Sequence, residues 1–407
     1  MSMRRKQVLL AFLALAAVIG APELALRAAR TAVNAYTAIP FGNDPNSARL
    51  FVRDPDLLWA LRPGARVEFL GATVEIGPRG LRGEPAAPGR RRVLCLGDSA
   101  TFGWRVSEAE TWPARLGAML REGSGPPEWE ALNAGVPGYS SFQVRRLAER
   151  LLPQVRPEVV VVCCGNNDSS LAFRSDADFF AHTRLRRAAD RVLSHSRLFL
   201  WLRDRLPQRT VGTLASLTDR PRTPRAGPRD YGENLRAVVR AARVHGARAV
   251  IVTPTRNVAS RPVLTATGRR AAQAEAWREA MAELLARGDR AEAARRIDAR
   301  LAAATNDVDA MWYRGMMLVH EGQIAEGREW IERAFECDVY PERAARPYLQ
   351  RVRAVAAEEE VTLVDSEQVL LARAKGPFAG EFFLDSCHPT AEGYRLIAEA
   401  IRDAIGK

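Results

Sequence analysis

The chain has 407 residues, of which 47% are hydrophobic and 27% charged, and it carries a formal net charge of +12. This is an ordinary globular composition, which excludes wholesale disorder, and the length exceeds the roughly 100–200 residues of a typical domain. The charge comes almost entirely from arginines, which are mixed with Asp and Glu and form no basic stripe interleaved with aromatic residues, so a nucleic-acid-binding role is only weakly supported.

The N-terminus combines Arg4, Arg5 and Lys6 with an apolar stretch over residues 8–21. This pattern is typical of either a signal-peptide core or a short membrane helix. Ile19 is large for the position three before a cut after Ala21, and no lipobox cysteine follows. We therefore expect residues 1–30 to be an uncleaved single-pass anchor in the inner membrane, with the body of the protein in the periplasm. Secretion after signal cleavage is the alternative.

Residues 31–90 contain short apolar pieces separated by Pro and Gly, as expected for a linker and an irregular lead-in. Within them, residues 66–76 alternate in polarity around Gly71, which predicts a small hairpin.

A repeating rhythm of strand and helix follows. Residues 92–96 and 129–133 predict the first two strands, and the β-branched run at 158–164 predicts a third that is covered on both faces. The remaining strands are expected at 249–254 and 361–365, with helical patterns at 114–120, 142–152, 179–205, from Tyr231 onwards and at 391–405, and with a proline- and arginine-rich linker at 221–228. Alternation of this kind predicts one α/β domain with a parallel sheet between helices, formed by residues 91–260 and 347–407.

Residues 261–346 interrupt this rhythm with a helical pattern that repeats itself. Gly288 and Gly322 are 34 positions apart, and the second copy resembles a tetratricopeptide repeat, whose period is 34 residues, with Trp312, Gly315, Gly322, Ala334 and Pro341. Two repeats are too few to be stable alone, so we expect them to pack on the α/β domain as an insertion. Such helices could be a plain structural element or a platform for a protein partner.

The five cysteines are Cys95, Cys163, Cys164, Cys337 and Cys387. Their odd number and the absence of a Cys-x-x-Cys pair argue against a disulfide scaffold and against a zinc site. Buried thiols are expected, with a bridge from Cys95 to Cys163 or Cys164 as the alternative.

Residues that could take part in catalysis directly follow three of the predicted strands. Gly97-Asp98-Ser99 follows the first, residues 133–138 with their glycines follow the second, and residues 165–168 (Gly-Asn-Asn-Asp) follow the third. Asp385 precedes His388 by three residues, close enough for the carboxylate to bond one ring nitrogen and to leave the other free as a base. Functional groups of a parallel sheet gather at the carboxyl ends of its strands.

These four blocks, in this order, resemble the GDSL/SGNH hydrolase family over residues 91–170 and 231–405, apart from the repeats. The resemblance implies a flavodoxin-like three-layer α/β/α sandwich, with Ser99 as nucleophile, His388 as general base and Asp385 orienting the base. It implies an oxyanion hole formed by the Ser99 N–H, the Gly135 N–H and the Asn167 side chain. The other histidines form no HExxH or comparable pair and no phosphate-binding glycine loop is present, so we expect no metal and no cofactor.

Ala100, Asp98 and Cys387 lie within these blocks, but none of them is expected to react with the substrate. Ala100 stands where many family members carry leucine, a position without a chemical role. Asp98 is expected to brace the turn, and Cys387 is expected to be a spacer.

The predicted function is hydrolysis of a carboxylic ester through an acyl-serine intermediate, on an acylated glycan or lipid of the periplasm. The alternatives are an O-acyltransferase acting on cell-envelope glycans and a scaffold whose helical insertion binds a protein partner while the hydrolase activity is secondary.

Overall fold

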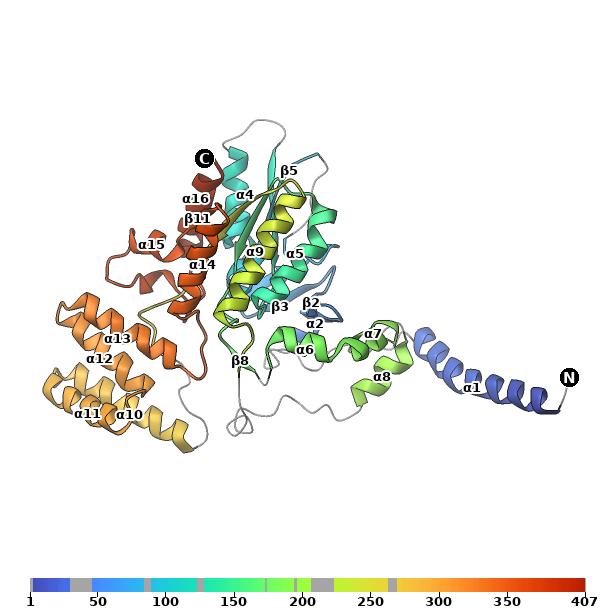
Figure 1. Ribbon diagram of the computed structural model, residues 1–407, viewed down its shortest axis with the longest axis horizontal. Coiled ribbons are helices and arrows are strands. Elements are labelled where there is room, and N and C mark those ends of the chain that lie inside the picture. The colour runs from blue at the N-terminus through green and yellow to red at the C-terminus, as the bar shows by residue number, and fades with distance from the viewer. Residues whose placement is uncertain are drawn as a thin grey trace.

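The computed structural model describes residues 3–29, 46–83, 89–122, 128–172, 174–193, 196–205, 223–262 and 269–406. At its centre lies a five-stranded parallel sheet with the strand order β11-β10-β7-β5-β6 (Figure 1). The strands are β5 (Arg91–Gly97), β6 (Trp129–Gly135), β7 (Val159–Cys163), β10 (Arg248–Val252) and β11 (Thr362–Val364). If the five strands are numbered by their order in the sequence and the sheet is followed from its β6 edge, the order is 2-1-3-4-5, which is the flavodoxin-like order.

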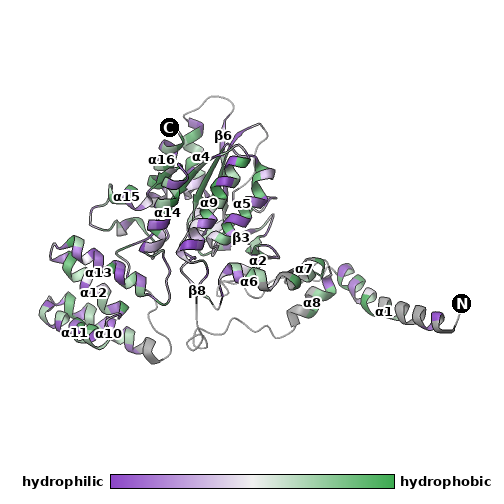
Figure 2. Cartoon of the chain, in the orientation of Figure 1, coloured by the Kyte–Doolittle hydropathy of each residue, from purple (hydrophilic) through white to green (hydrophobic). Residues whose placement is uncertain are grey.

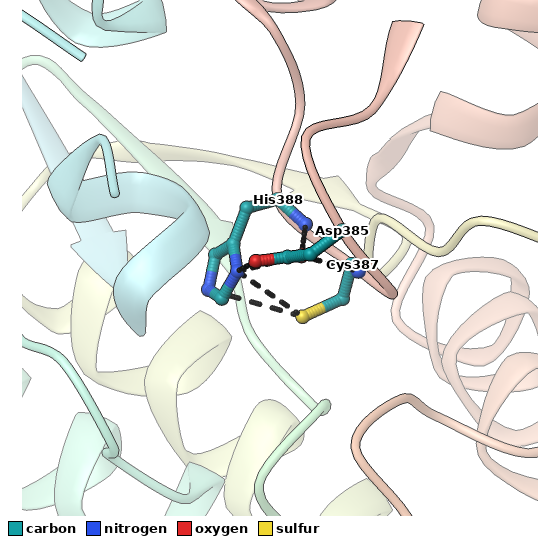
Figure 3. A group of neighbouring side chains, drawn as sticks. All are labelled: Asp385, Cys387 and His388. Carbon is teal, nitrogen blue, oxygen red and sulfur yellow. Dashed lines mark hydrogen bonds and ion pairs between the residues drawn. The ribbon is translucent and has the colours of Figure 1, made fainter. Parts of the chain in front are cut away.

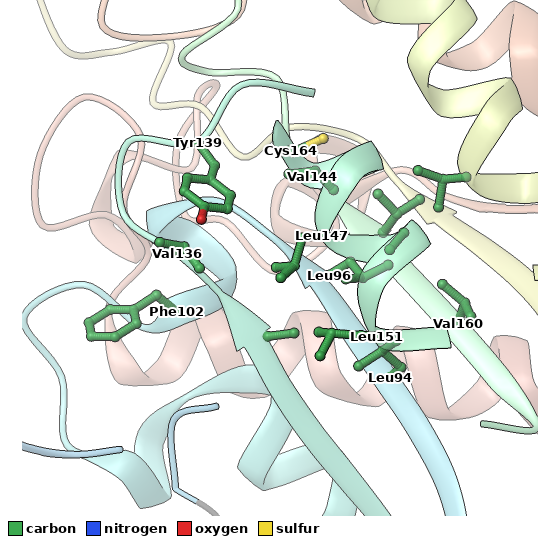
Figure 4. Packing of buried hydrophobic residues seen from close by; sticks show 14 of the residues in the cluster. Leu94, Leu96, Phe102, Val136, Tyr139, Val144, Leu147, Leu151, Val160 and Cys164 are labelled. Atoms are coloured by element: carbon green, nitrogen blue, oxygen red, sulfur yellow. The ribbon is translucent and has the colours of Figure 1, made fainter. Parts of the chain in front are cut away.

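Helices cover both faces of the sheet because successive strand residues point to opposite sides. Leu94 and Leu96 of β5 face α5 (Ser141–Val155), α9 (Pro228–Val244) and α14 (Arg346–Glu358), whereas Val93 and Cys95 face α4 (Trp112–Glu122) and α16 (Ala391–Gly406). Figure 4 shows part of the first of these two cores, where Leu147 and Leu151 of α5 pack on the sheet. Hydrophobic residues dominate the strands and hydrophilic ones occur on the outer sides of the helices (Figure 2). The expected three-layer sandwich is confirmed.

The described part of the lead-in is an integral part of this core. Residues 46–83 form the helix α2 (Ser47–Leu50) and two antiparallel hairpins, β1 (Phe51–Asp54) with β2 (Leu58–Leu61) and β3 (Arg66–Phe69) with β4 (Ala72–Glu75). The second hairpin turns at Gly71, as the alternating sequence predicts. Phe51, Trp59 and Phe69 belong to the same buried cluster as β5 and α5, so these residues are more than a linker. Residues 30–45 and 84–88 of the predicted lead-in lie outside the described residues.

The insertion consists of two helical hairpins between β10 and α14. The first pairs α10 (Arg269–Ala286) with α11 (Arg290–Ala303), and the second pairs α12 (Val308–His320) with α13 (Ile324–Cys337). Gly288 and Gly322, which are one predicted repeat apart, both have a positive φ, of 79° and 84°, in the turn of their hairpins. A glycine adopts this backbone conformation without strain. Kinship with tetratricopeptide repeats stays a prediction.

A buried cluster of charges connects the insertion to the α/β domain. The Arg256 guanidinium, after β10, donates 2.8 Å and 2.9 Å hydrogen bonds to Glu332 of α13 and to Glu367 of α15 (Ser366–Leu371). All three side chains are less than a tenth exposed. Because an unpaired charge is costly in such surroundings, these contacts keep α13 close to the loop that follows β10.

The remaining helices lie on the opposite side of the molecule from the insertion (Figure 1). They are α1 (Met3–Ala28), α6 (Asp176–His182), α7 (Arg184–Leu193) and α8 (Arg197–Arg205), so the predicted helical stretch at 179–205 is three helices. Among the described residues, none of the helices combines the length and the apolar character that a membrane crossing requires. The predicted anchor therefore stays a prediction.

Short elements complete the fold. The segment that begins with Ser99 forms α3 (Ser99–Phe102), followed by the 3-10 turn η1 (Glu108–Glu110), and the 3-10 turn η3 (Gly380–Phe382) precedes α16. The predicted linker at 221–228 is partly wrong, since β9 (Thr223–Pro224) pairs with β8 (Leu171–Ala172) and Pro228 begins α9. All five cysteines are free thiols, so the alternative bridge from Cys95 does not form.

The close approach of α12 and α13 generates a prediction. A Cβ atom on Gly315 would lie 2.5 Å from the Gly327 carbonyl oxygen, which is closer than real contacts allow. Gly315→Ala should therefore lower the free energy of unfolding by about 2 kcal/mol, as overpacked sites do. Urea unfolding measures this change. Gly376→Ala is the matched control, because a Cβ there meets nothing within 4 Å, and an equal effect of the two substitutions would contradict the packing argument.

Candidate active site

Ser99 lies at the carboxyl edge of the sheet, at the point where the strand order reverses between β5 and β7. It is the first residue of α3, and Asp98 caps this helix by accepting a 2.9 Å hydrogen bond from the Ala100 N–H. Gly97 permits the turn, since a Cβ there would lie 2.0 Å from the Cys163 carbonyl oxygen. Asp98 thus braces the turn as expected, and Ser99 stands where ligands of such sheets usually bind.

The structure brings Ser99, His388 and Asp385 together in one hydrogen-bonded line. His388 Nε2 lies 2.7 Å from Ser99 Oγ, and His388 Nδ1 lies 2.8 Å and 2.9 Å from the two carboxylate oxygens of Asp385. The two residues after Asp385 return to it, since the backbone N–H groups of Cys387 and His388 donate to Asp385 Oδ1 at 3.0 Å and 2.9 Å. Figure 3 shows the part of this arrangement formed by Asp385, Cys387 and His388. Such a line can transfer the hydroxyl proton of Ser99 to the imidazole.

The loop after β10 holds the segment that carries His388. Thr255 Oγ1 donates a 2.8 Å hydrogen bond to the Cys387 carbonyl, and the Asn257 N–H donates one of the same length to the Ser386 carbonyl. The Asn257 side chain donates to the Asp385 carbonyl at 3.1 Å. The sequence patterns gave no signal for Thr255 or Asn257, because their partners are backbone carbonyls.

Arg82, from the lead-in, binds backbone carbonyls at the end of α3, the helix that begins with Ser99. Its guanidinium is fully buried and donates to the carbonyls of Phe102, Gly103 and Val106 at 2.8 Å, 2.6 Å and 2.8 Å, while forming a 2.9 Å ion pair with Glu108. Carbonyls at the end of a helix lack partners within it, so a fixed cation there satisfies them. A buried arginine in a segment that looks like a linker has no recognisable sequence signal.

The three predicted oxyanion-hole donors differ in whether a described residue already accepts a hydrogen bond from them. The Asn167 side chain donates one hydrogen bond to the Tyr139 carbonyl at 3.1 Å, which leaves the second hydrogen of its amide for a ligand. The structure contradicts the role expected for Gly135, because its N–H donates to Asn133 Oδ1 at 3.0 Å and it packs closely against α3. No described residue accepts a hydrogen bond from the Ser99 N–H.

Gly138, three residues further on, differs from Gly135 in that its N–H is not bonded to any described residue. It has a positive φ of 79° in a turn closed by the Tyr139 N–H and the Val136 carbonyl, and no described residue accepts from its own N–H. Arg225 binds the Gly138 carbonyl at 2.7 Å, which fixes the peptide beside Asn167's partner Tyr139. The Pro137-Gly138 pair is a turn signal that could have pointed to this position.

Electrostatics favour an ionised Asp385 beside a basic His388. Burial opposes ionisation of Asp385, but His388 and the nearby N–H groups lower its pKa to about 2. Burial likewise lowers the pKa of His388, and the neighbouring Cys387 and Asp385 outweigh it, so the net direction is above the ordinary 6.5. Desolvation raises the pKa of Asp98 to about 6. An imidazole made more basic in this way is a stronger proton acceptor.

Cys387 lies beside the base without replacing Ser99 in the hydrogen-bonded line. Its Sγ is 3.7 Å from His388 Nδ1 and 3.8 Å from Nε2, and the residue is buried. Asp385, Cys387 and His388 are also the one group of the described residues whose ligand atoms lie close enough together, within 4.8 Å, to hold a metal ion. In this structure the Asp385 and His388 atoms bond to each other and to Ser99 instead.

An aromatic contact adds a fourth partner to the base. The Trp104 indole stacks on the His388 imidazole with centroids 5.2 Å apart and an angle of 19° between the planes, and Phe69 of the lead-in meets Trp104 edge-on at 5.6 Å. The backbone N–H of Trp104 donates to the Ser99 carbonyl at 3.1 Å. Trp104 therefore fixes the plane of the base relative to the nucleophile, a role that no sequence motif indicated.

Comparison with family models gives a match to the GDSL-like lipase/acylhydrolase family over residues 95–320, more than half of the chain. The chain belongs to this family. It is therefore an enzyme of the esterase and acylhydrolase type, as the four sequence blocks predict. The matched range includes Ser99 and Asn167 and ends before Asp385 and His388, which the fold brings to Ser99.

Solved structures of related enzymes are similar at low sequence identity. A GDSL-like lipase from Bacteroides thetaiotaomicron is 14% identical, with a TM-score of 0.37 over 79% of this chain and 91% of that one. An acetylxylan esterase from Geobacillus stearothermophilus is 12% identical, with a TM-score of 0.38 over 78% and 95%. The psychrotrophic esterase EstA from Pseudoalteromonas sp. is 13% identical, with a TM-score of 0.37 over 78% and 97%. A search of curated proteins found no match.

The raised pKa of His388 predicts a pH profile. The imidazole accepts the Ser99 proton only when it is neutral, so kcat/KM of an ester substrate should rise with pH, with its midpoint above the ordinary 6.5. Asp385→Asn removes a charge that stabilises the imidazolium, so this midpoint should move to lower pH while kcat falls by up to about 10⁴-fold. Hydrolysis rates measured from pH 5 to 10 test this. A midpoint that Asp385→Asn leaves unchanged would contradict the assignment.

The stacked indole predicts a second, smaller effect. Trp104→Leu keeps an apolar side chain but removes the π face, which stabilises a cation by about 0.5–2 kcal/mol. We expect kcat to fall about tenfold with little change in KM, and the pH midpoint to move down by about half a unit. Trp104→Phe is the matched control and should retain most of both. If the two variants behave alike, the indole only fills space.

Proposed function

We propose that the protein hydrolyses a carboxylic ester through an acyl-serine intermediate on Ser99. The observation that carries this proposal is the 2.7 Å contact between Ser99 Oγ and His388 Nε2, with Asp385 on the other ring nitrogen. A serine hydroxyl becomes nucleophilic when an adjacent base accepts its proton, and the base needs a partner that fixes its tautomer. The serine, its base and the partner of the base all lie at one edge of the sheet.

In the first half of the reaction, His388 takes the Ser99 proton as Oγ attacks the ester carbonyl. The developing oxyanion is stabilised by the free hydrogen of the Asn167 amide, by the Ser99 N–H and by the Gly138 N–H, each worth about 3 kcal/mol in comparable sites. The imidazolium, paired with Asp385, then protonates the leaving alcohol. In the second half, His388 activates a water molecule that releases the acid and restores Ser99.

The substrate is proposed to be an acylated glycan or lipid of the cell envelope. The sequence supports this through the basic start and the apolar stretch at 8–21, which are typical of an exported or membrane-attached protein. On this proposal the α/β domain faces the periplasm. Transfer of the acyl group to a glycan hydroxyl in place of water uses the same acyl-serine and is the second candidate.

Hydrolysis of short p-nitrophenyl esters tests the proposal. Ser99→Ala and His388→Ala should each lower kcat by at least about 10⁴-fold, since these two groups act as a unit. Ser107→Ala, an exposed serine in the turn before η1, is the matched control and should be fully active. An active Ser99→Ala enzyme would exclude the acyl-serine route.

The alternatives give different results in the same assay. An acyltransferase would form the acyl-enzyme and turn over slowly until a sugar acceptor is added. A scaffold would show only weak ester cleavage, and its partner binding would be lost on deletion of residues 269–346.

A further inference from the structure

The helix α7 exposes its apolar side to solvent. Leu185, Ala188, Ala189 and Val192 follow the spacing i, i+3, i+4 and i+7, so they share one face of the helix. All four are exposed, Leu185 to 87% and Val192 to 73%. A surface helix normally turns such a stripe towards the protein core, so this one presents a face suited to another apolar environment.

Exposed apolar residues concentrate in this part of the molecule. Of the twelve large apolar side chains that are exposed among the described residues, eight lie on α1, α6, α7 and α8: Val18, Ile19, Leu24, Phe179, Leu185, Val192, Leu193 and Leu202. The remaining four are scattered over other elements. Figure 1 shows α1, α7 and α8 next to one another, away from the insertion.

Specific contacts join α1 to α8. The Glu23 carboxylate of α1 accepts hydrogen bonds from the backbone N–H groups of Arg197 and Leu198 at 3.0 Å and 2.7 Å, and from Ser196 Oγ at 2.8 Å. Arg197 and Leu198 are the first residues of α8. The backbone N–H groups at the start of a helix have no partner within it. These hydrogen bonds hold α1 against the start of α8, the helix that follows α7 in the chain.

The charge of this region is strongly positive. Residues 184–205 contain seven arginines and two aspartates, and on α7 the charged positions alternate with the apolar stripe along the helix. Trp201 lies on α8. An amphipathic helix with arginines on its polar face and aliphatic or aromatic residues on the other is typical of helices that lie in the headgroup layer of a membrane.

We propose that α7 and α8, together with α1, form a surface that binds a lipid bilayer containing anionic phospholipids. The apolar stripe of α7 enters the boundary between headgroups and acyl chains, and the arginines pair with lipid phosphates. This contact is independent of the ester chemistry. A protein partner is less well matched, because interface cores are depleted of charge whereas residues 184–205 carry seven arginines and two aspartates.

Vesicle binding of the full-length protein tests the proposal. The double variant with Leu185→Gln and Val192→Gln keeps a helix-forming side chain at both positions, and the two sites are already exposed, so folding should be unaffected. Flotation with phosphatidylcholine vesicles, with and without phosphatidylglycerol, gives the partition coefficient. The control double variant carries Val244→Gln and Ile324→Gln, two apolar residues that are 83% and 49% exposed on α9 and α13.

The expected result is tighter binding to the phosphatidylglycerol vesicles, a loss of about tenfold or more in the α7 variant, and less than about twofold in the control. Equal binding by the α7 variant and the parent, or equal losses in both variants, would overturn the proposal. So would concentration-dependent self-association that the α7 variant alone abolishes without a change in vesicle binding, since the stripe would then be a protein interface. Ester hydrolysis, measured in parallel, distinguishes these outcomes from failure of the active site.

Discussion

The hydrogen bond between Ser99 and His388 joins residues that are 289 positions apart, and most features of the fold serve to keep it short. The strand order places Ser99 beside the reversal point of the sheet, where the edge is open to a ligand. The nucleophile helix is fixed at its start by Asp98 and at its end by Arg82. A proton passes between Ser99 and His388 only at hydrogen-bond distance, so small displacements of either segment would cost much of the rate.

The insertion supports the same geometry through the loop after β10. Arg343, in the segment between α13 and α14, is buried and donates to the carbonyls of Ser260 and Arg261, and the neighbouring Ala344 N–H donates to Asn166 Oδ1 at 3.0 Å. Asn166 precedes Asn167, the proposed oxyanion-hole residue, and Asn257 in the loop after β10 holds the segment of His388. The segment between α13 and α14 thus contacts both the loop after β10 and the loop after β7. Removing the insertion would leave buried donors and acceptors without partners, at a cost of about 1–3 kcal/mol each.

The sequence predicts the α/β framework well because its strands are continuous apolar runs, as in β7, and its chemical groups follow strand ends. It also places Ser99, Asp385 and His388, since local motifs carry them. It fails for Gly135, because a motif does not show which of two nearby glycines has a free N–H. It is also silent on Arg82 and Trp104, whose partners are a backbone end and an imidazole distant in sequence. Contacts of this kind are set by tertiary packing, which local patterns do not encode.

Covalent trapping of the nucleophile tests the central claim most directly. The full-length protein is treated with a fluorophosphonate, and intact mass and peptide mapping locate the adduct. The account predicts one adduct, on Ser99, formed at least about 100-fold more slowly in the His388→Ala variant, because the serine then lacks its base. An adduct on Cys387 or on another serine, or rapid labelling without His388, would contradict it.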